Sequence, residues 1–484
     1  MKAIGVLGTG SSVGKTWVAT ALCAWLRRQG VRVAPCKTQN MSNNAWALPE
    51  GGEIARAQAM QAEACGLVPT AEMNPILLKP SGCAGSQLIL GGRPEGVVPA
   101  ADYYLEYDRL WAHVAGVLDG WRGRCDALVL EGAGSPVELN LMDRDLANLR
   151  PIRHVDGRWL LVGDIDRGGI FAQLAGTWNL LPAADRPRGL GAIVNRFRGD
   201  KALFADPGTR LLPHAPGLAV LGTIPWRRDL QPETEDGFDR GDEDRGSGDT
   251  IAWIRYPHVA AVTDCQPWWD DTGVRTRWID DPAQLAGAKA IVLPGSKNTL
   301  GDLRWLRANG WFEAVAAAAR NGVLVVGICG GYQMLGERLE DREGLAGDAG
   351  SEAGVGLLPI TTGFRPDKIV QQVTAECAGR SWKAYEIHMG RSTVTRPCEP
   401  LQMVTDSQGV RPEGLRCGNV WGTYLHGWFE APEVRRKVTA AAGITAHRAE
   451  PILWAEKRHE VYAQMADHLA AHVDLGPVRR YLGL

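Results

Sequence analysis

The feature that most constrains this chain is a glycine-rich loop directly after its first apolar segment. Residues Lys2 to Leu7 have the continuous apolar character of a buried strand, and a helix-period stretch runs from Lys15 to Arg28. Between them lies the sequence GTGSSVGKT, residues 8–16. Glycines let backbone N–H groups close around phosphate oxygens, and the N-terminus of the following helix favours negative charge. The order strand, loop, helix therefore predicts a phosphate-binding loop in a parallel α/β sheet.

The loop supplies groups suited to a nucleotide. Lys15 offers a point charge for a phosphate, and Thr16 offers a hydroxyl that can hold Mg²⁺. Thr9 stands where the strict GxxxxGK[ST] pattern has its first glycine. A turn with a purely structural role is the alternative, but the element order favours nucleotide binding. The predicted nucleotide-binding residues are Thr9, Gly10, Gly14, Lys15 and Thr16, together with Lys37 after the second apolar run.

Polar clusters follow the next apolar runs of the first half, at Val31–Ala34, Ala127–Leu130 and Trp159–Val162. Parallel sheets bind ligands at the carboxyl ends of their strands. A carboxylate there, facing a phosphate loop, is a natural Mg²⁺ ligand. Each cluster alone could be a loop cap, but three at consecutive strand ends favour one shared site. The residues concerned are Lys37, Glu131, Asp164 and Asp166.

The chain is too long for a single hydrophobic core, and its regular α/β patterning is interrupted once. Its 484 residues favour two or three domains. Residues 232–249 hold eight acidic side chains among Gly and Arg without apolar periodicity. This is typical of a solvated linker, a binding tail being the alternative. We predict a phosphate-loop domain over 1–231, an acidic linker over 232–249 and a second α/β domain over 250–484.

Both domains are expected to contain further apolar strands. In the first domain these are Gly191–Val194 and Leu218–Leu221. In the second they are Ile251–Ile254, Val259–Val262, Ala290–Leu293, Leu324–Gly327, Tyr385–His388 and Asn419–Thr423. The helices expected there span Leu300–Arg320 and Gly331–Arg338.

The second domain contains a candidate nucleophile. The buried strand ending at Gly327 leads through Ile328 into Cys329, two glycines and a helix. This strand-to-helix elbow exposes a nucleophile, and the helix N-terminus lowers the pKa of a thiol. Gly330 could supply an N–H group for an oxyanion, as could the loop that begins at Gly295. A buried cysteine with only a packing role is the alternative.

A nucleophilic thiol needs a base, and two histidines are candidates. His426 stands at the end of a strand in TYLHG, and we favour it as the base. His388 is the rival and is expected to have a supporting or structural role. Period-two alternation places Glu386 on the same strand face as His388.

Composition excludes several classes of protein. The 53 Lys and Arg against 55 Asp and Glu give a formal net charge of −2, which excludes a surface built to coat nucleic acid. No window approaches the ~20 apolar residues of a membrane span, and the N-terminal run leads into the glycine loop rather than a cleavage site. Ten cysteines without a CxxC pair predict neither a zinc site nor a disulfide framework. We expect a cytoplasmic protein with reduced thiols and without nucleic-acid or membrane partners; a homo-oligomer is left open.

Longer strings resemble a known family. GICGGYQML, GTYLHG and PGSKNT are similar to class I (triad-type) glutamine amidotransferases, and the first half resembles the dethiobiotin-synthetase-like P-loop fold. KTQNMSNNAW, GGEIARAQ, MNPILLKP, LVLEGAGSPVELNL, DIDRGGIFA and NRFRGD extend the resemblance over nearly the whole chain to the cobyric acid synthase family. The resemblance implies ATP- and glutamine-dependent amidation of the b, d, e and g carboxylates of adenosylcobyrinic acid a,c-diamide, a corrinoid, with Mg²⁺ and through an acyl phosphate.

The resemblance also implies roles for single residues. Cys329 and His426 fall on the nucleophile and base, and Glu131 on the Mg²⁺-binding acid, with Glu53 as a weaker second ligand. The glutamine and oxyanion site is expected to include Gly295, Ser296, Gly330 and Gln333. Candidates for the synthetase substrate site are Asn40, Asn43, Asn74, Lys79, Asp164 and Asp166.

The chain departs from the family pattern in places. Ser12 replaces an aspartate, and the string NFTDFD appears here as AVTDCQ, residues 261–266. Class I amidotransferases generally have a glutamate two residues after the histidine, but position 428 is Trp here, and the cobyric acid synthase family also lacks that acid. Another group must therefore orient His426: a backbone carbonyl or Glu386. The alternatives are cobyrinic acid a,c-diamide synthase, a CTP-synthase-like enzyme, and a scaffold ATPase with an inactive second domain.

Overall fold

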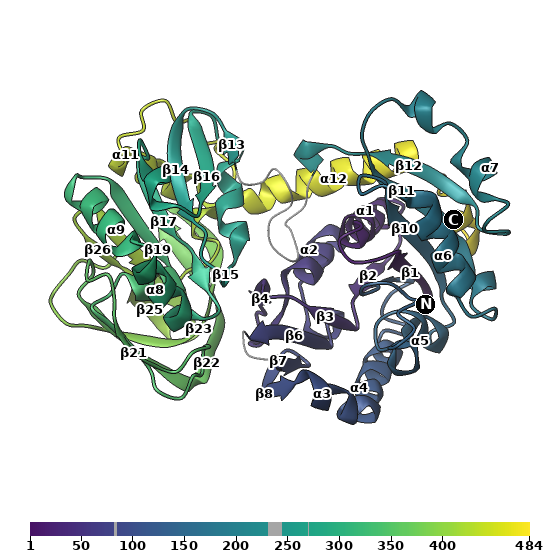
Figure 1. Ribbon diagram of the computed structural model, residues 1–484, viewed down its shortest axis with the longest axis horizontal. Coiled ribbons are helices and arrows are strands. Elements are labelled where there is room, and N and C mark those ends of the chain that lie inside the picture. Colours follow the sequence, from purple (N-terminus) through teal and green to yellow (C-terminus); the bar gives the residue numbers. More distant parts are fainter. Residues whose placement is uncertain (82–84, 231–243, 270) are drawn as a thin grey trace.

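The computed structural model describes residues 1–81, 85–230, 244–269 and 271–484, and its two halves form separate α/β lobes (Figure 1). The first half contains a six-stranded sheet in which every pairing is parallel, in the order β12-β11-β10-β1-β9-β2. Its strands overlap the six predicted apolar runs and span β1 (Lys2–Gly8), β2 (Val33–Cys36), β9 (Ala127–Glu131), β10 (Arg158–Asp164), β11 (Gly189–Phe197) and β12 (Val220–Pro225).

Helices pack against this sheet, and smaller sheets extend it towards the other lobe. The helices are α1 (Lys15–Arg28), α2 (Arg56–Cys65), α3 (Ala100–Tyr103), α4 (Tyr107–Gly120), α5 (Leu149–His154), α6 (Ile170–Leu180) and α7 (Pro207–Leu211). The extension consists of β3 (Gln39–Met41), β6 (Ile76–Ser81), β7 (Gly85–Leu90) and β8 (Arg93–Pro99), with the hairpin of β4 (Ala45–Ala47) and β5 (Glu53–Ala55) beside it.

The second lobe combines a mixed sheet with a largely antiparallel one. The mixed sheet has the order β13 (Asp244–Gly246), β16 (Val274–Ile279), β14 (Asp249–Ile254), β17 (Ala290–Leu293), β19 (Leu324–Ile328), β27 (Val420–Thr423) and β26 (Leu415–Cys417). The largely antiparallel sheet contains β21 (Gly350–Ala353), β20 (Arg338–Asp341), β22 (Ile360–Cys377), β24 (Gln402–Asp406), β25 (Gly409–Glu413) and β23 (Arg380–Val394), which pairs with β22. Within it, β20 and β22 pair in parallel. The short strands β15 (Val259–Ala260) and β18 (Gly295–Ser296) pair with each other.

Three predicted elements of this lobe differ in their limits. The expected helix over 300–320 is two helices, α8 (Thr299–Ala308) and α9 (Trp311–Arg320), because Gly310 adopts a left-handed conformation with φ +77° between them. The next helix, α10 (Gly330–Met334), ends four residues earlier than expected. The strand expected over 259–262 stops at Ala260 and continues into a 3₁₀ segment, η7 (Val262–Trp268).

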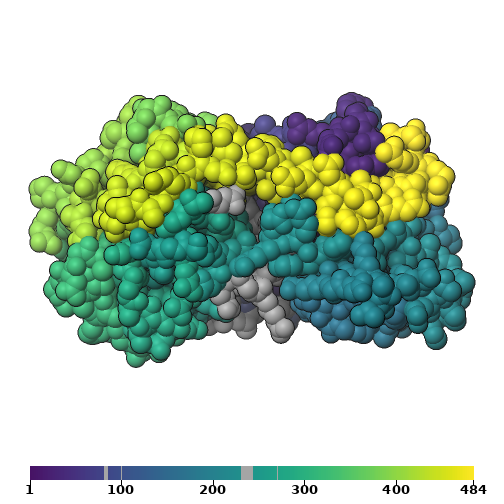
Figure 2. Space-filling model, turned by 90° about the horizontal axis from the view of Figure 1, so that it is seen from above, coloured from purple at the N-terminus to yellow at the C-terminus, as the bar shows by residue number. Residues whose placement is uncertain are grey.

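The C-terminal segment crosses from the second lobe to the first. After α11 (Pro432–Ala441), the long helix α12 (Trp454–His472) runs along the top of both lobes, and α13 (Gly476–Leu482) follows it (Figures 1 and 2). Apolar residues of both, including Met465 and Val478, belong to the buried cluster that contains α1 and the central strands of the first sheet. The predicted range 250–484 assigned these helices to the second domain, whereas they pack on the first.

Two further predictions concern the linker and the cysteines. Residues 231–243, most of the predicted acidic linker, lie outside the described residues, while Asp244 and Asp249 belong to strands rather than to a linker. The expectation that all thiols are reduced is wrong for one pair, because Cys398 and Cys417 form a disulfide. Over the described part of the chain, no helix has the length and apolarity of a membrane span.

Candidate active sites

The phosphate loop is held in a closed shape by its own backbone and by a neighbouring strand. Gly14 has φ +96°, and a Cβ at this position would lie 2.0 Å from Nδ2 of Asn195, so only glycine fits. Nδ2 of Asn195 donates to the carbonyl of Val13 at 3.0 Å. Lys15 Nζ lies inside the loop and donates to the carbonyls of Gly10 and Gly134 at 2.8 and 3.0 Å. A buried ammonium group among loop carbonyls is positioned to meet a phosphate.

Glu131 lies at the end of β9 and connects the predicted residues of this site. Its Oε1 accepts hydrogen bonds from Thr16 Oγ1 at 2.7 Å and Lys37 Nζ at 3.0 Å. Its Oε2 accepts from Gln61 of α2 at 2.5 Å. A hydroxyl and a carboxylate side by side are oxygen ligands of the kind that Mg²⁺ uses, since Mg²⁺ takes few protein ligands and completes its shell with phosphates and water. Thr16 and Glu131 therefore fit the predicted metal role.

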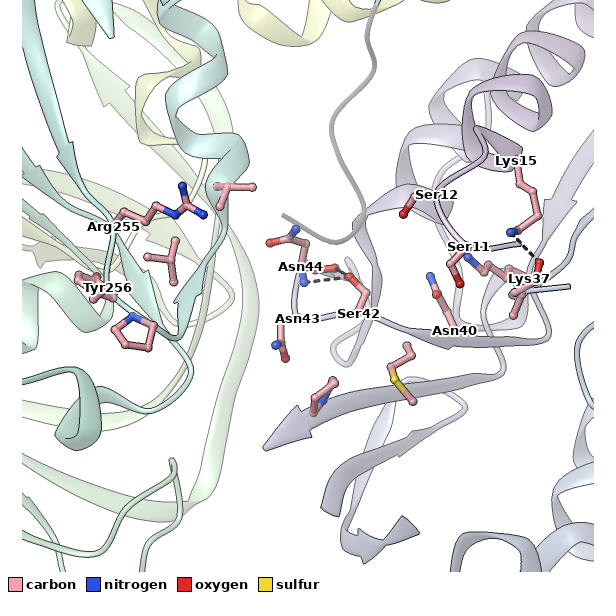
Figure 3. Close-up of a pocket in the computed structure, with 17 residues that line it drawn as sticks. Ser11, Ser12, Lys15, Lys37, Asn40, Ser42, Asn43, Asn44, Arg255 and Tyr256 are labelled. Atoms are coloured by element: carbon pink, nitrogen blue, oxygen red, sulfur yellow. Dashed lines mark hydrogen bonds between the residues drawn. The ribbon is translucent and has the colours of Figure 1, made fainter. Parts of the chain in front are cut away.

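A cavity of about 710 Å³ opens in front of the loop and is bordered by both lobes. Figure 3 shows Ser11, Ser12 and Lys15 on one wall and Arg255 and Tyr256 of the second lobe on the opposite wall. Asn40 and Asn43, two predicted substrate residues, also line the cavity. Neighbouring Asn44 accepts the N–H of Ala261 at 3.0 Å and so joins the lobes at its edge.

Three other predicted substrate residues have structural partners and do not line this cavity. Asn74 is buried, and its side chain bonds to the backbone of Ala55, Lys37 and Ile76. Asp164 accepts the N–H of Asp166 and lies near two arginines, while Asp166 pairs with Arg198 at 3.3 Å. Asn74 thus fixes the loops after β2 and β5, and the two aspartates fix the loop after β10.

Glu53 does not join Thr16 and Glu131, so its prediction as a second metal ligand is wrong. One of its oxygens contacts Lys79 Nζ at 2.5 Å, and the other contacts Lys368 of the second lobe. The charges of Lys368 and Lys79 hold the pKa of the Glu53 carboxyl well below its usual range despite complete burial. Both carboxylate oxygens are therefore engaged by ammonium groups. Lys79 itself lies in a different cavity, described below.

Cys329 occupies a sharp turn between β19 and α10. Its backbone has φ +51° and ψ −107°, a strained conformation for a residue with a side chain, and such strain is a mark of functional sites. Its N–H donates to the carbonyl of Thr423 at 2.8 Å, and the N–H of Gly331 donates to Pro294 at 2.9 Å. These bonds fix the elbow between β27 and the loop after β17. The predicted nucleophile elbow is present.

We expect Gly331→Ala to destabilise the second lobe. A Cβ at this position would lie 1.9 Å from the carbonyl oxygen of Leu293, which is backbone and cannot rotate away. Overpacking of this kind costs about 1–3 kcal/mol or more, and it would also displace Cys329. Urea unfolding and glutamine hydrolysis should both be impaired. A matched change at Gly330, where the nearest atoms are the backbone nitrogen and Cβ of Ser296 at 2.8 and 2.9 Å, should also destabilise the lobe but by less, because the overlap is smaller.

His426 is oriented by an aspartate that the sequence reasoning did not identify. Its Nδ1 lies 2.8 Å from Oδ2 of Asp264 in η7, and Oδ1 of Asp264 accepts the N–H of Gly427 at 2.9 Å. Burial lowers the pKa of His426, but the Asp264 charge and hydrogen bonds to Asp264 and Cys329 outweigh it and raise the pKa to about 10. Cys329, His426 and Asp264 therefore form a triad. Asp264 binds Nδ1 of His426, and Nε2 is the ring nitrogen available for proton transfer.

The two supporting residues predicted for His426 have other partners. Glu386 contacts Arg411 at 2.6 Å and accepts from Gln371 at 2.5 Å, so it does not orient His426. Nδ1 of His388 donates to the carbonyl of Gly390 at 2.7 Å, and the ring stacks on Tyr424 with centroids 3.8 Å apart. Burial lowers the pKa of His388 to about 3, which keeps it neutral.

A second cavity, of about 280 Å³, contains Cys329. Three of the four residues predicted for glutamine and its oxyanion line it: Ser296, Gly330 and Gln333. The fourth, Gly295, packs against His426, because a Cβ built on it would lie 3.1 Å from Cε1 of that ring. Lys79 and Pro80 of the first lobe also line this cavity, and Pro80 lines the phosphate-loop cavity as well. The C-terminal end of strand β6 therefore lies between the two cavities.

Among the residues that the structure describes, no group of three or more His, Cys, Asp or Glu is arranged to hold a metal. The metal role of Thr16 and Glu131 therefore depends on two protein oxygens together with ligands from the nucleotide.

Two family models together match most of the chain. Residues 4–237 match the model described as the CobQ/CobB/MinD/ParA nucleotide binding domain, and residues 250–434 match the CobB/CobQ-like glutamine amidotransferase domain. The first range includes the phosphate loop and Glu131, and the second includes the triad of Cys329, His426 and Asp264.

Relatives are similar over nearly the full length. The cobyric acid synthase of Roseiflexus castenholzii is 44% identical over 98% of this chain and 97% of its own length. That of Variovorax paradoxus is 45% identical over 91% of this chain and 93% of its own, and that of Chloroflexus aggregans is 46% identical over 89% of both.

Proposed function

Since the chain belongs to the cobyric acid synthase family and is a glutamine-dependent amidotransferase, we propose that it amidates the b, d, e and g carboxylates of adenosylcobyrinic acid a,c-diamide. Its place is in cobalamin biosynthesis. The observation that carries the proposal is the pairing of two cavities in one chain. One contains the phosphate loop, the other contains the triad, and Pro80 borders both.

The glutaminase half-reaction follows from the triad. His426 takes the proton of the Cys329 thiol, and Sγ attacks the side-chain carbonyl carbon of glutamine to form a tetrahedral intermediate, with N–H groups near Gly295 and Gly330 as the proposed oxyanion donors. His426, protonated and held by Asp264, gives a proton to the departing ammonia. His426 then removes a proton from water, which attacks the thioester and releases glutamate.

The synthetase half-reaction uses the groups around the phosphate loop. The γ-phosphoryl group of ATP passes to a corrinoid carboxylate, and Lys15 stabilises the charge on the transferring group. Mg²⁺, held by Thr16 and Glu131, would supply further neutralisation of the phosphates. Ammonia then attacks the acyl phosphate carbon and displaces phosphate, which leaves the amide. The volume of about 710 Å³ and the walls from both lobes suit a large substrate.

The direct test is a reaction of the purified protein with ATP, Mg²⁺, glutamine and adenosylcobyrinic acid a,c-diamide, followed by mass spectrometry. Each conversion of a carboxylic acid to an amide lowers the mass by about one unit, and we expect four successive steps. If glutamine is hydrolysed while the corrinoid stays unchanged, the glutaminase chemistry is supported and the proposed substrate is wrong. No turnover of ATP or glutamine would instead favour a scaffold role.

Lys15→Ala is expected to stop amide formation while retaining glutamine hydrolysis. The variant removes the ammonium group that the loop holds between Gly10 and Gly134, so phosphoryl transfer should fall by about 10²–10³-fold. Phosphate release and glutamate release, measured in the same sample, separate the two activities. A matched loss of both would show that the triad needs a functional phosphate loop.

A further inference from the structure

Four charged side chains meet where the two lobes touch, beside the triad cavity. Glu53 of β5 and Lys79 of β6 come from the first lobe. Lys297, which directly follows β18, and Lys368 of β22 come from the second. Glu53 contacts both Lys79 and Lys368. Lys297 lines the same cavity as Lys79 and Lys368, and its pKa responds to the charges of Lys368 and Glu53. We refer to these four residues as the lysine cluster.

The lysine cluster contains three amino groups and a single carboxylate. Burial lowers the pKa of Lys79 and of Lys368 to about 8, so both remain largely charged near neutral pH. Burial also lowers the pKa of Lys297, which the charge of Lys368 lowers further. A buried positive charge is costly when no counter-charge lies beside it. An anion that supplies the missing counter-charge is therefore stabilised in this cluster.

The other charged groups of the cavity do not offset this surplus. Asp348 also lines it, but its carboxylate accepts from Asn298 and lies 3.6 Å from Arg304. His388 is kept neutral by burial. The three lysines and Cys329 line the same cavity, so an anion bound by the lysine cluster lies near the nucleophile.

We infer that the lysine cluster binds the α-carboxylate of glutamine. In glutamine, a short chain separates this carboxylate from the side-chain amide that Cys329 attacks. Gln333 and Ser296, which also line the cavity, are polar. Lys79 belongs to the synthetase lobe, so the glutamine site is complete only when the lobes are docked. The inference rests on glutamine hydrolysis at Cys329 and reassigns Lys79, expected at the corrinoid site, to the glutamine site.

The test compares two substrates in wild type and in Lys79→Met. L-Glutamine has the α-carboxylate, and L-glutaminamide replaces it with a neutral amide; hydrolysis of the latter at Cys329 is followed through its product isoglutamine. Wild type should prefer glutamine by about 100-fold in kcat/KM. Lys79→Met should raise the KM for glutamine by about 30-fold and change hydrolysis of the amide by less than about threefold. Lys383→Met, at an exposed lysine of β23, is the matched control.

The outcomes separate the possibilities. An equal loss with both substrates, or an unchanged KM for glutamine, would overturn the inference. Lys79→Met leaves Glu53 paired with Lys368, so the fold should persist, as circular dichroism will show. If the variant does not fold, Lys297→Met, which leaves both contacts of Glu53 intact, replaces it with the same expected result. Amidation of the corrinoid with ammonium chloride by wild type tests the proposed function independently of this site.

Discussion

Cys329→Ser is expected to abolish amidation from glutamine, by at least about 10⁴-fold, while amidation from ammonium chloride continues. The serine hydroxyl would stand in the same strained elbow, but it is far less nucleophilic than a thiolate at neutral pH. The phosphate-loop cavity lies on the other side of Pro80, so its chemistry should proceed once ammonia is supplied in solution. Corrinoid mass and glutamate release, measured with each nitrogen source, give the two rates.

The control for this variant is Cys377→Ser, which changes a half-buried thiol of β22 and should leave both rates unchanged. Loss of the ammonium-dependent reaction in Cys329→Ser would contradict the two-cavity mechanism. It would mean that the thiol takes part in amide formation itself or that the lobes act as a single site.

The parts of the molecule that could be predicted are those whose signals are contiguous in the sequence. The strand β1, the phosphate loop and α1 follow one another without interruption, and so do β19, Cys329 and α10. In each case a buried strand, a glycine turn and a helix specify the geometry locally, so a functional side chain is placed by its immediate neighbours.

Asp264 was missed because nothing local specifies it. It lies in a 3₁₀ segment that contains Pro267, and it meets His426 through tertiary contacts 162 residues apart in sequence. The retained aspartate in AVTDCQ, aligned with the family string NFTDFD, was the signal that could have identified it. The sequence offers Glu386 instead, because period-two alternation places it on the same strand face as His388, but in the structure Glu386 pairs with Arg411.

The assignment of Glu53 failed for a related reason. Its expected metal role came from the family resemblance alone. Its carboxylate is instead satisfied across the lobe boundary by Lys368, 315 residues away. The packing of α12 on α1 is also a long-range contact, so nothing local in the sequence indicates which lobe that helix covers.

Asp264→Asn is expected to lower glutamine hydrolysis by about 10³–10⁴-fold without unfolding the protein. The asparagine Oδ1 can still accept the N–H of Gly427, which preserves the local turn. Its amide group would face Nδ1 of His426 as a donor, which disfavours the tautomer that leaves Nε2 free to act as a base and removes the charge that stabilises the imidazolium. Steady-state glutamate release gives the loss, and ammonium-dependent amidation is the internal reference.

The pH dependence of stability provides the check that the effect acts through His426. A histidine whose folded-state pKa is raised from 6.5 to about 10 stabilises the fold fully below pH 6.5, and this contribution is lost as the pH rises through 10. In Asp264→Asn, burial without the aspartate charge lowers the pKa instead, so the contribution is absent. The wild type should therefore exceed the variant in free energy of unfolding by an amount that shrinks from pH 6.5 to 10.

The control variant is Glu386→Gln, which should retain glutaminase activity within about tenfold. A larger loss in Glu386→Gln than in Asp264→Asn would assign the orienting acid to Glu386, because only the acid that holds His426 can impose the correct tautomer on the base.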